Sequence, residues 1–257
     1  MYILPVLPKI NRWHKINNSI FPPTNCTAIV PFNGKLNSTL GLPKITKFIR
    51  DCTYLNTECL GIFIGILLGD AYIKKPQKDN QNVRIGFKQS IINLPYMYEV
   101  FTKLSHYCNT VPRVEYTTLK IEGKNPKIYK LLVLETRCYP VLNILRDLFH
   151  DENGVKVIKP ELFHYITPIS LAHLIMCDGL SNQYGLTICT DCFTVEEVVR
   201  LINILKIKFY LDCNIHYLRG KPRIYVLARS MTTLRNLVAP YFIDFSLYKL
   251  NKGRRFN

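Results

Sequence analysis

Residues 60–71 are Leu-Gly-Ile-Phe-Ile-Gly-Ile-Leu-Leu-Gly-Asp-Ala, an apolar run that ends in one carboxylate, Asp70. The uninterrupted run predicts a buried helix over residues 60–70. Gly61, Gly65 and Gly69 recur every four residues, so they fall on one face of that helix. Each mid-helix glycine costs roughly 1 kcal/mol relative to alanine. The glycine face therefore indicates that another backbone lies very close to it.

A second apolar run ends in the same way. Residues 168–179 are Pro-Ile-Ser-Leu-Ala-His-Leu-Ile-Met-Cys-Asp-Gly, and Asp178 follows Asp70 by 108 residues. The order helix, strands, helix, hairpin, helix recurs around the two runs. We therefore expect a pseudo-twofold protein of mixed α and β structure (α+β), built from two helix-strand-strand-helix-strand-strand-helix units.

The apolar spacing also gives expected bounds for the elements. The first unit should contain strands over 71–75, 83–89, 113–121 and 127–135, with helices over 94–107 and 139–149. The second should contain a helix over 168–179, a strand region from 186 to 190, a helix over 194–209, a hairpin of 214–218 and 223–228 around 220–222, and a helix over 231–241. Thr194 and Glu197 form a capping-box pattern at the start of the 194–209 helix. The expected domains are a basic N-terminal extension (1–50), an N-terminal half (51–160) and a C-terminal half (161–257).

The charge balance points to an anionic partner. The chain has 34 Lys and Arg against 18 Asp and Glu, a net charge of +16, and 48% hydrophobic residues, which predict a packed protein. A membrane is the weaker candidate, since the longest apolar run has ten residues and a span needs roughly 20. Residues 1–50 hold seven Lys or Arg, no acid and no secretory signal. They could be a loosely ordered leader, a basic arm on phosphates, or an organelle transit peptide.

Cysteine usage and alanine content indicate the compartment. The nine cysteines are odd in number and mostly in apolar surroundings, which predicts reduced thiols in an intracellular compartment. Cys189 and Cys192 form one Cys-x-x-Cys, and without a second pair this is weak evidence for zinc. Only five alanines occur, while Ile, Asn and Lys are abundant, as in AT-rich organelle genomes.

The two terminal aspartates are the candidate metal ligands. If the two apolar helices pack in parallel, Asp70 and Asp178 meet at one end, where they repel each other and the helix dipoles. Cations between them would relieve that repulsion. Carboxylate oxygens favour Mg²⁺, which keeps waters and takes phosphate oxygens as further ligands. The arrangement therefore suits metal-assisted phosphodiester hydrolysis.

These residues resemble the LAGLIDADG homing endonucleases. Residues 63–71 resemble the first copy of the family's motif, and residues 171–179 resemble the second copy. The flanking strings Gly69-Asp70-Ala71-Tyr72-Ile73, 167–172 and Tyr248-Lys249-Leu250 fit the single-chain, two-motif branch found in organelle introns, over roughly residues 55–250.

The resemblance implies two motif helices at a central interface and two saddle-shaped antiparallel sheets along the DNA major groove. It implies a monomer, mitochondrial and organelle-encoded, that cuts both strands of double-stranded DNA and leaves short 3′ overhangs. The implied target spans about 20 base pairs, roughly two helical turns. The implied cofactor is Mg²⁺, with Mn²⁺ as a substitute and Ca²⁺ supporting binding without cleavage.

The resemblance also implies roles for single residues. Asp70 and Asp178 match the metal-binding acids, and Gly69 and Cys177 precede them at the metal site. The family carries one lysine near the active site in each half. Lys249 matches one of them, and Lys156 matches the other, with Lys159 as an alternative. The sequence departs from the motif at His173, where the family has glycine and where we expect a core residue, and at Cys177, where many members have a second acid.

The predicted strands and loops carry the residues expected to bind DNA. Alternate strand residues face one way, so one face can meet DNA while the other enters the core. Arg can bridge guanine, and Asn or Gln can pair with adenine. The candidates are Lys74, Lys75, Arg84, Lys88, Arg113, Lys120, Lys130, Asn182, Gln183, Thr190, His216, Arg219, Lys221 and Arg223.

Three functions fit these features. The first is a site-specific double-strand DNA endonuclease with a divalent metal held by two aspartates. The second is an intron maturase that binds RNA on the same scaffold. The third is a DNA-binding regulator without catalysis. The presence of both acids favours the endonuclease, because a pure maturase does not need the pair.

Overall fold

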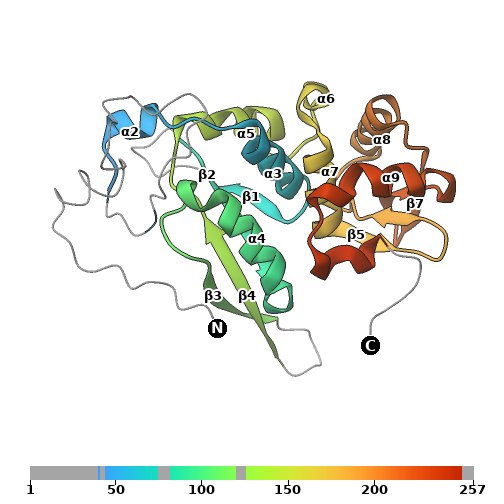
Figure 1. Cartoon of the computed structure of the whole chain (residues 1–257), viewed down its shortest axis with the longest axis horizontal. Coiled ribbons are helices and arrows are strands. Elements are labelled where there is room, and N and C mark those ends of the chain that lie inside the picture. The colour runs from blue at the N-terminus through green and yellow to red at the C-terminus, as the bar shows by residue number, and fades with distance from the viewer. Residues whose placement is uncertain (1–39, 41–43, 75–81, 120–125, 251–257) are drawn as a thin grey trace.

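The computed structural model describes residues 40, 44–74, 82–119 and 126–250, which form two similar units side by side (Figure 1). The first contains α3 (Thr57–Leu68), β1 (Ala71–Lys74), β2 (Arg84–Ser90), α4 (Leu94–Leu104), β3 (Arg113–Leu119), β4 (Lys127–Glu135) and α5 (Asn143–Phe149). The second contains α7 (Pro168–Asp178), β5 (Gly179–Ser181), β6 (Leu186–Ile188), α8 (Val195–Phe209), β7 (Cys213–Leu218), β8 (Lys221–Val226) and α9 (Met231–Val238). Short helices α2 (Lys47–Asp51) and α6 (Leu162–Tyr165) precede the two units, and 3-10 turns follow several helices.

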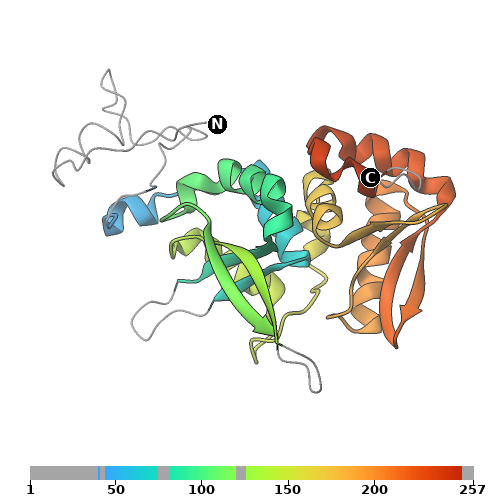
Figure 2. The same cartoon turned by 90° about the horizontal axis from the view of Figure 1, so that it is seen from below.

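Each unit has one four-stranded antiparallel sheet. The strand orders are β1-β2-β4-β3 and β5-β6-β8-β7, which are the same order in the two units. Figure 2 shows the two units from below, with the green strands β3 and β4 at the front of the first unit. The sequence prediction of a duplicated α+β fold with two antiparallel sheets is therefore confirmed.

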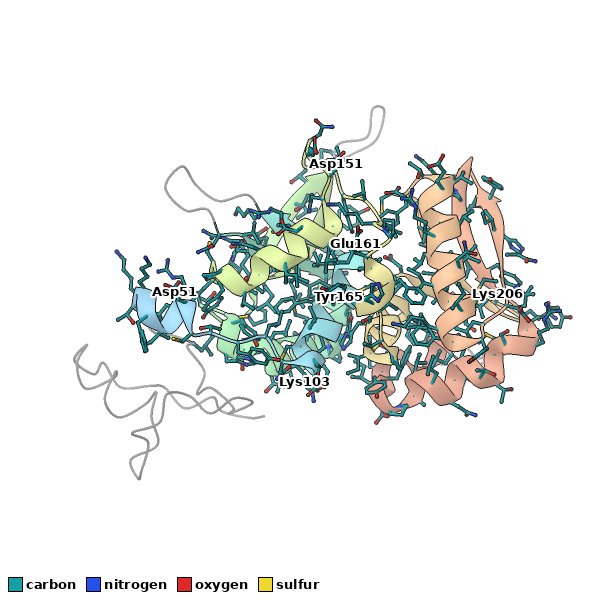
Figure 3. The ribbon with its side chains drawn as sticks, turned by 90° about the horizontal axis from the view of Figure 1, so that it is seen from above. Asp51, Lys103, Asp151, Glu161, Tyr165 and Lys206 are labelled. Carbon is teal, nitrogen blue, oxygen red and sulfur yellow. The ribbon has the colours of Figure 1, made fainter. Side chains whose placement is uncertain are left out.

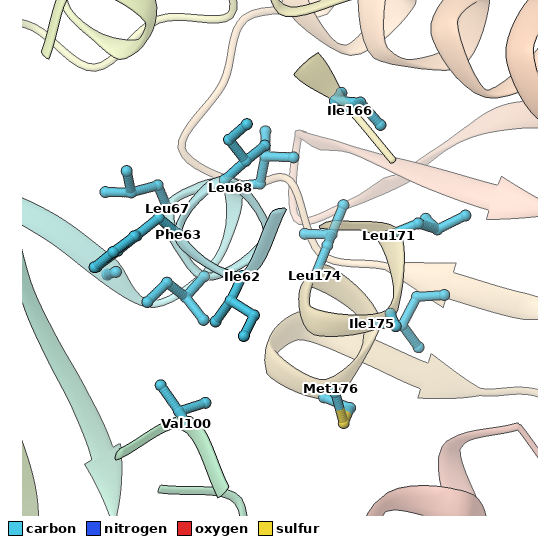
Figure 4. Packing of buried hydrophobic residues seen from close by; sticks show 14 of the residues in the cluster. Ile62, Phe63, Leu67, Leu68, Val100, Ile166, Leu171, Leu174, Ile175 and Met176 are labelled. Carbon is cyan, nitrogen blue, oxygen red and sulfur yellow. The ribbon is translucent and has the colours of Figure 1, made fainter. Parts of the chain in front are cut away.

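Helices α3 and α7 form the centre of the molecule. Apolar side chains of both helices, including Ile62, Leu174 and Met176, join one continuous core (Figure 4). A Cβ on Gly61 would lie 3.1 Å from Thr167 Oγ1, and a Cβ on Gly65 would lie 2.5 Å from His173 Cβ. These contacts advance along both helices in the same direction, so α3 and α7 run parallel. The glycine face is the close-contact face, as expected.

Local sequence explains where these helices begin. The side chain of Asn56 caps α3 by accepting from Cys59 N at 2.7 Å. Thr167 and Ser170 cap α7 reciprocally, and Thr194 and Glu197 form the predicted capping box of α8. These caps satisfy backbone N–H groups that a helix start leaves without partners.

Some expected bounds differ from the structure. Strand β5 was not expected, and β6 ends at Ile188. The second hairpin turns at Arg219 and Gly220, with φ of 53° and 75°, so Lys221 and Pro222 belong to β8. Helix α2 crosses the expected boundary at residue 50, and Ile45 packs into the core. Lys75, Lys120 and most of the N-terminal extension lie outside the described residues.

The outer helices mark the two ends of the molecule. Asp51 on α2 and Lys206 on α8 lie at opposite ends in Figure 3. Among the described helices, none combines the length and the apolar character that a membrane crossing requires.

Candidate active site

The C-terminal ends of α3 and α7 meet. A Cβ on Gly69 would lie 2.6 Å from Cys177 Cβ and 2.9 Å from Asp178 Oδ2. Gly69 directly precedes Asp70, so the close approach of the two backbones brings the two acids to one place. Asp70 is exposed and Asp178 is partly buried. Both carboxylates belong to the same end of the helix pair, between the two sheets.

The surroundings of the acid pair disfavour the ionised form of Asp178. The pKa of Asp178 is raised to about 7, first by burial and second by the nearby charge of Asp70. Lys249 and Lys156 act in the opposite direction and lower that pKa, but burial and repulsion prevail. A cation bound between the acids would stabilise their ionised forms.

Each half supplies one lysine to this site. Lys156 Nζ donates to the carbonyl of Gly69 at 3.1 Å, and Lys249 Nζ donates to the carbonyls of Met176 and Cys177 at 2.6 Å and 2.9 Å. Burial lowers the pKa of both lysines, and the charges of Asp70 and Asp178 partly oppose that shift. Lys159 donates instead to the carbonyl of Asp147 at 2.6 Å. The structure thus brings Lys156, and not Lys159, to the acids.

Sequence reasoning missed Gln89, which contacts Asp70. Its Nε2 donates to Asp70 Oδ2 at 2.5 Å, and its Oε1 accepts from Asn93 Nδ2 at 2.7 Å. The signal was present in the pairing of β1 and β2. Ala71 pairs with Phe87, so the residue two positions after Phe87 returns to the end of α3.

The second half does not repeat this amide contact. Gly179 pairs with Ile188, which makes Thr190 the counterpart of Gln89. Thr190 is 1% exposed, and its hydroxyl donates to the carbonyl of Pro222 at 2.7 Å. The prediction that Thr190 contacts DNA is therefore wrong, because its side chain is buried and its hydroxyl is bonded within the protein. The two halves of the site are chemically different.

A buried polar cluster lies behind the acids. Tyr96 Oη lies 3.0 Å from His173 Nδ1 and 3.5 Å from Cys177 Sγ, and it donates to the carbonyl of His173 at 3.2 Å. Burial lowers the pKa of His173 to about 3, so its ring is neutral. His173 is thus a satisfied core residue, as expected. The thiol of Cys177 lies between Tyr96 and the backbone of Asp70.

The first sheet presents a basic face next to the acids. Strand register places Lys74, Arg84, Lys88 and Arg113 on one face. Two acids hold them there. Glu135 lies 3.3 Å from Lys74, 3.6 Å from Arg113 and 4.0 Å from Arg84, while Glu115 lies 3.2 Å from Lys88 and 2.9 Å from Arg113.

The same register separates Lys130 from that face. Lys130 pairs with Tyr116, and its Nζ lies 5.9 Å from the Tyr116 ring. Alternation along β4 directs Lys130 to the opposite face from Arg113. Tyr72, which the sequence analysis did not select, lies on the basic face with its ring against Gly86 and 5.9 Å from Lys88 Nζ.

The second sheet has a similar face. Arg223 makes a two-bond contact with Asp191 at 2.7 Å and 2.6 Å, and His216 stacks on Tyr225 with ring centroids 4.3 Å apart. Asn182 Nδ2 donates to Thr187 Oγ1 at 2.6 Å. Gln183, Arg219 and Lys221 are exposed. Of these, His216, Lys221 and Arg223 share the face of Thr187 by register.

Few side chains are available to hold a metal. Within the described ranges, no group of three or more His, Cys, Asp or Glu side chains is placed to bind one ion. Two carboxylates and nearby backbone carbonyls would leave most positions of a bound ion to water and to substrate oxygens. That division suits Mg²⁺, which usually keeps several waters and takes phosphate as a ligand.

Two duplicated α+β units whose central helices end in paired acids define the homing-endonuclease class of fold. Residues 60–234 match the model of the LAGLIDADG DNA endonuclease family. The chain therefore belongs to that family.

Similar proteins include both nucleases and splicing factors. The chain is 34% identical over 208 residues to "Cytochrome b mRNA maturase bI2" of Saccharomyces cerevisiae, covering 76% of this chain and 48% of that protein. It therefore spans about half the length of the yeast maturase. It is 33% identical to "Probable intron-encoded endonuclease 1" of Wickerhamomyces canadensis, covering 82% of this chain and 93% of the relative.

A solved structure supports the same fold. The chain resembles "The homing endonuclease I-WcaI bound to its DNA recognition sequence" with a TM-score of 0.68 and 32% identity, covering 79% of this chain and 89% of that one.

Proposed function

We propose that this chain is a site-specific double-strand DNA endonuclease that uses a divalent metal. The observation that carries the proposal is the convergence of Asp70 and Asp178 at the meeting ends of α3 and α7. The position lies between two basic sheet faces, where a DNA backbone could reach both acids. The similar structure, a homing endonuclease bound to its DNA recognition sequence, supports DNA as the substrate.

The residues present fit a Mg²⁺ site. Asp70 and Asp178 would supply carboxylate oxygens, and Gly69 and Cys177 would supply backbone oxygens, while phosphate oxygens complete the set. Burial, and then the charge of Asp70, raise the pKa of Asp178, and a bound cation would favour its ionised form. When bound, the ion would supply a water of lowered pKa and stabilise the leaving oxygen. Mn²⁺ would substitute, and Ca²⁺ would support DNA binding without cleavage.

The protein residues orient the reacting groups. Lys156 and Lys249 place one ammonium in each half, where it stabilises developing negative charge and orders water. Gln89 fixes the carboxylate of Asp70 through its amide, and Asn93 fixes Gln89 in turn. Each half would act on one strand, and the products would carry short 3′ overhangs.

The basic faces would hold the DNA. In the first half, Lys74, Arg84, Lys88 and Arg113 would face the major groove, and in the second half His216, Lys221 and Arg223 would do so. Asn182, Gln183 and Arg219 would contact the outer part of the target from their loops. Lys130 would contribute only if DNA wraps the hairpin. Lys75 and Lys120 keep the DNA-contact role that the sequence analysis gives them.

The test is cleavage of a library of intronless insertion-site DNAs by the wild type, Asp70→Asn and Asp178→Asn. Each variant should lose Mg²⁺-dependent double-strand cleavage and keep DNA binding in Ca²⁺. Asp147→Asn is the matched control, because the Asp147 side chain is exposed and forms a surface ion pair with Arg146 at 3.0 Å, away from the acids. Full double-strand cleavage by either acid variant would refute the proposal.

A maturase role is the second candidate. The relative named as a cytochrome b mRNA maturase supports it. The Asp178→Asn variant lacks the proposed cleavage activity. If it binds the host intron RNA and the RNA splices faster in its presence than alone, the chain has a maturase role that does not depend on cleavage. Tight, metal-dependent DNA binding with no nicking by the wild type over hours would instead indicate a regulator.

We also infer a mitochondrial location and a monomeric state. The amino-acid composition, which is typical of AT-rich organelle genes, and the relatives named as cytochrome b mRNA maturases support the location. The monomer is supported by the two halves, because one chain already contains both acids and both sheets.

A further inference from the structure

A cationic cavity lies at the outer end of the first half. It measures about 230 Å³ and opens between the segment at residues 44–50, the start of β2 and the residues after β4. Four basic side chains line it, together with the polar residues Asn109 and Thr136. The basic residues are Lys44, Arg50, Arg84 and Arg137.

The positive charge of this cavity is poorly neutralised. None of its described lining residues is acidic, and in the described part of the chain neither Lys44 nor Arg50 makes an ion pair. Arg84 lies 4.0 Å from Glu135, a carboxylate that it shares with Lys74 and Arg113. The pKa of Arg137 is lowered chiefly by burial, and the like charge of Arg50 adds to that shift.

Backbone contacts hold the basic residues in place. Thr46 caps α2 by accepting from Ile49 N at 3.2 Å, and the neighbouring Ile45 is buried in the core. On the other wall, Arg137 N donates to the carbonyl of Tyr107 at 2.8 Å. Thr136 Oγ1 accepts from Ile85 N at 3.0 Å. The cavity is therefore built before any ligand arrives, which reduces the entropy lost on binding.

The geometry points to a phosphate-binding site, and we propose that its ligand is a backbone phosphate of the target DNA several base pairs from the cleavage site, on the side that the N-terminal half binds. The inference rests on the proposed function, because it requires DNA along the sheets. Guanidinium groups match phosphate oxygens in two-bond contacts. A volume of about 230 Å³ exceeds the space of several waters, so a phosphate group fits.

Arg84 joins this cavity to the basic face of the sheet. It pairs with Lys74, the fourth residue after Asp70 along β1. At about 3.3 Å per residue, Arg84 lies roughly 13 Å from the acids along the strand direction. Helix α2 lies further out still, at the end away from the second half (Figure 3). The cavity would therefore meet DNA several base pairs outside the cleavage site.

The experiment measures DNA affinity in EDTA between 50 and 200 mM salt for Lys44→Gln and Arg50→Gln. Lys47→Gln is the matched control, because Lys47 is exposed on α2 and does not line the cavity. Each test variant should bind roughly threefold to tenfold more weakly than wild type. Each should also reduce the salt slope by about one. The control should change neither quantity, and melting curves check that all three variants fold.

DNA length and free phosphate distinguish the sources of the ligand. The target is shortened at each end in turn, and one of the two shortened duplexes should bind wild type and Arg50→Gln equally. Inorganic phosphate binding that Arg50→Gln abolishes, with no effect of DNA length, would assign the cavity to free phosphate and overturn the DNA role. If Lys44→Gln and Arg50→Gln both match wild type in DNA affinity, salt slope and phosphate binding, the cavity is not a phosphate-binding site. A wild type that binds no duplex at all would refute the proposed function instead, and the phosphate titration alone would then decide the cavity.

Discussion

His173 shows how one buried side chain can couple the fold to pH. Its ring is 4% exposed and lies against the Tyr96 hydroxyl. Its pKa is about 3 in the folded protein, below the ordinary value of 6.5, because burial disfavours the imidazolium. Between these two values the unfolded chain binds a proton that the folded chain does not. The part of the stability that His173 controls is therefore complete above pH 6.5 and falls as the pH drops toward 3.

We expect His173→Gln to remove this part of the acid sensitivity. Loss of one differential proton reduces the slope of unfolding free energy against pH by up to about 1.4 kcal/mol per unit. Urea denaturation at several values from pH 7.5 to 4.5 measures the slope. His164→Gln, a variant on the short helix α6, is the control. Equal slopes for His173→Gln and wild type would show that His173 is protonated in the fold.

Lys156 and Lys159 lie three positions apart in the sequence and have different environments. Lys156 contacts the carbonyl beside Asp70, and Lys159 contacts the carbonyl of Asp147. We expect Lys156→Met to lower the cleavage rate by about a hundredfold or more. Lys159→Met should remain close to wild type. Single-turnover cleavage of target DNA measures both, and a larger loss in Lys159→Met would reverse the assignment.

The spacing between helices α3 and α7 determines which glycines of α3 can be replaced by alanine. A methyl group on Gly65 would lie 2.5 Å from both His173 Cβ and the Ser170 carbonyl, and the backbone there cannot easily move. We expect Gly65→Ala to destabilise the protein by about 3 kcal/mol. Gly61→Ala is the matched control, since its methyl would meet atoms at 3.1 Å and beyond. Its helix propensity gain of about 1 kcal/mol would offset that crowding.

Urea unfolding at neutral pH measures both glycine variants. A Gly65→Ala protein as stable as Gly61→Ala would show that the helices can separate without cost. The two variants share the same chemistry change and the same helix, so only the local distance between α3 and α7 distinguishes them.

The elements that could be predicted from sequence are those with long or repeated patterns. Helix α8 shows this, since its apolar spacing and its Thr194–Glu197 cap act locally. The acids could be placed together because the glycine face of α3 forced a close partner. Strand β5 has three residues and no alternation to detect. The positions of Gln89 and Thr190 relative to the acids depend on strand register. Register pairs segments that are distant in sequence, so the residues near Gln89 and Thr190 do not reveal it.

Gln89 makes the two halves of the molecule chemically different at the acids. Its amide contacts Asp70, whereas its counterpart Thr190 is buried against Pro222. We expect Gln89→Ala to slow the cutting of one strand more than the other. A supercoiled plasmid carrying the target should then pass through more nicked circle than with wild type. Asn203→Ala, which removes an exposed amide on α8, is the control. An unchanged ratio of nicked to linear product in Gln89→Ala would contradict the asymmetry.

The one-sided glycine face has a consequence for the kind of sequence this protein can recognise. Gly61, Gly65 and Gly69 of α3 pack against Ile169, His173 and Cys177 of α7. The face of α3 without side chains thus accommodates the larger side chains of α7. A second copy of α7 in place of α3 would bring these larger side chains against one another at the same close spacing. The two units are therefore not interchangeable, and we expect the proposed DNA target not to need a palindromic sequence.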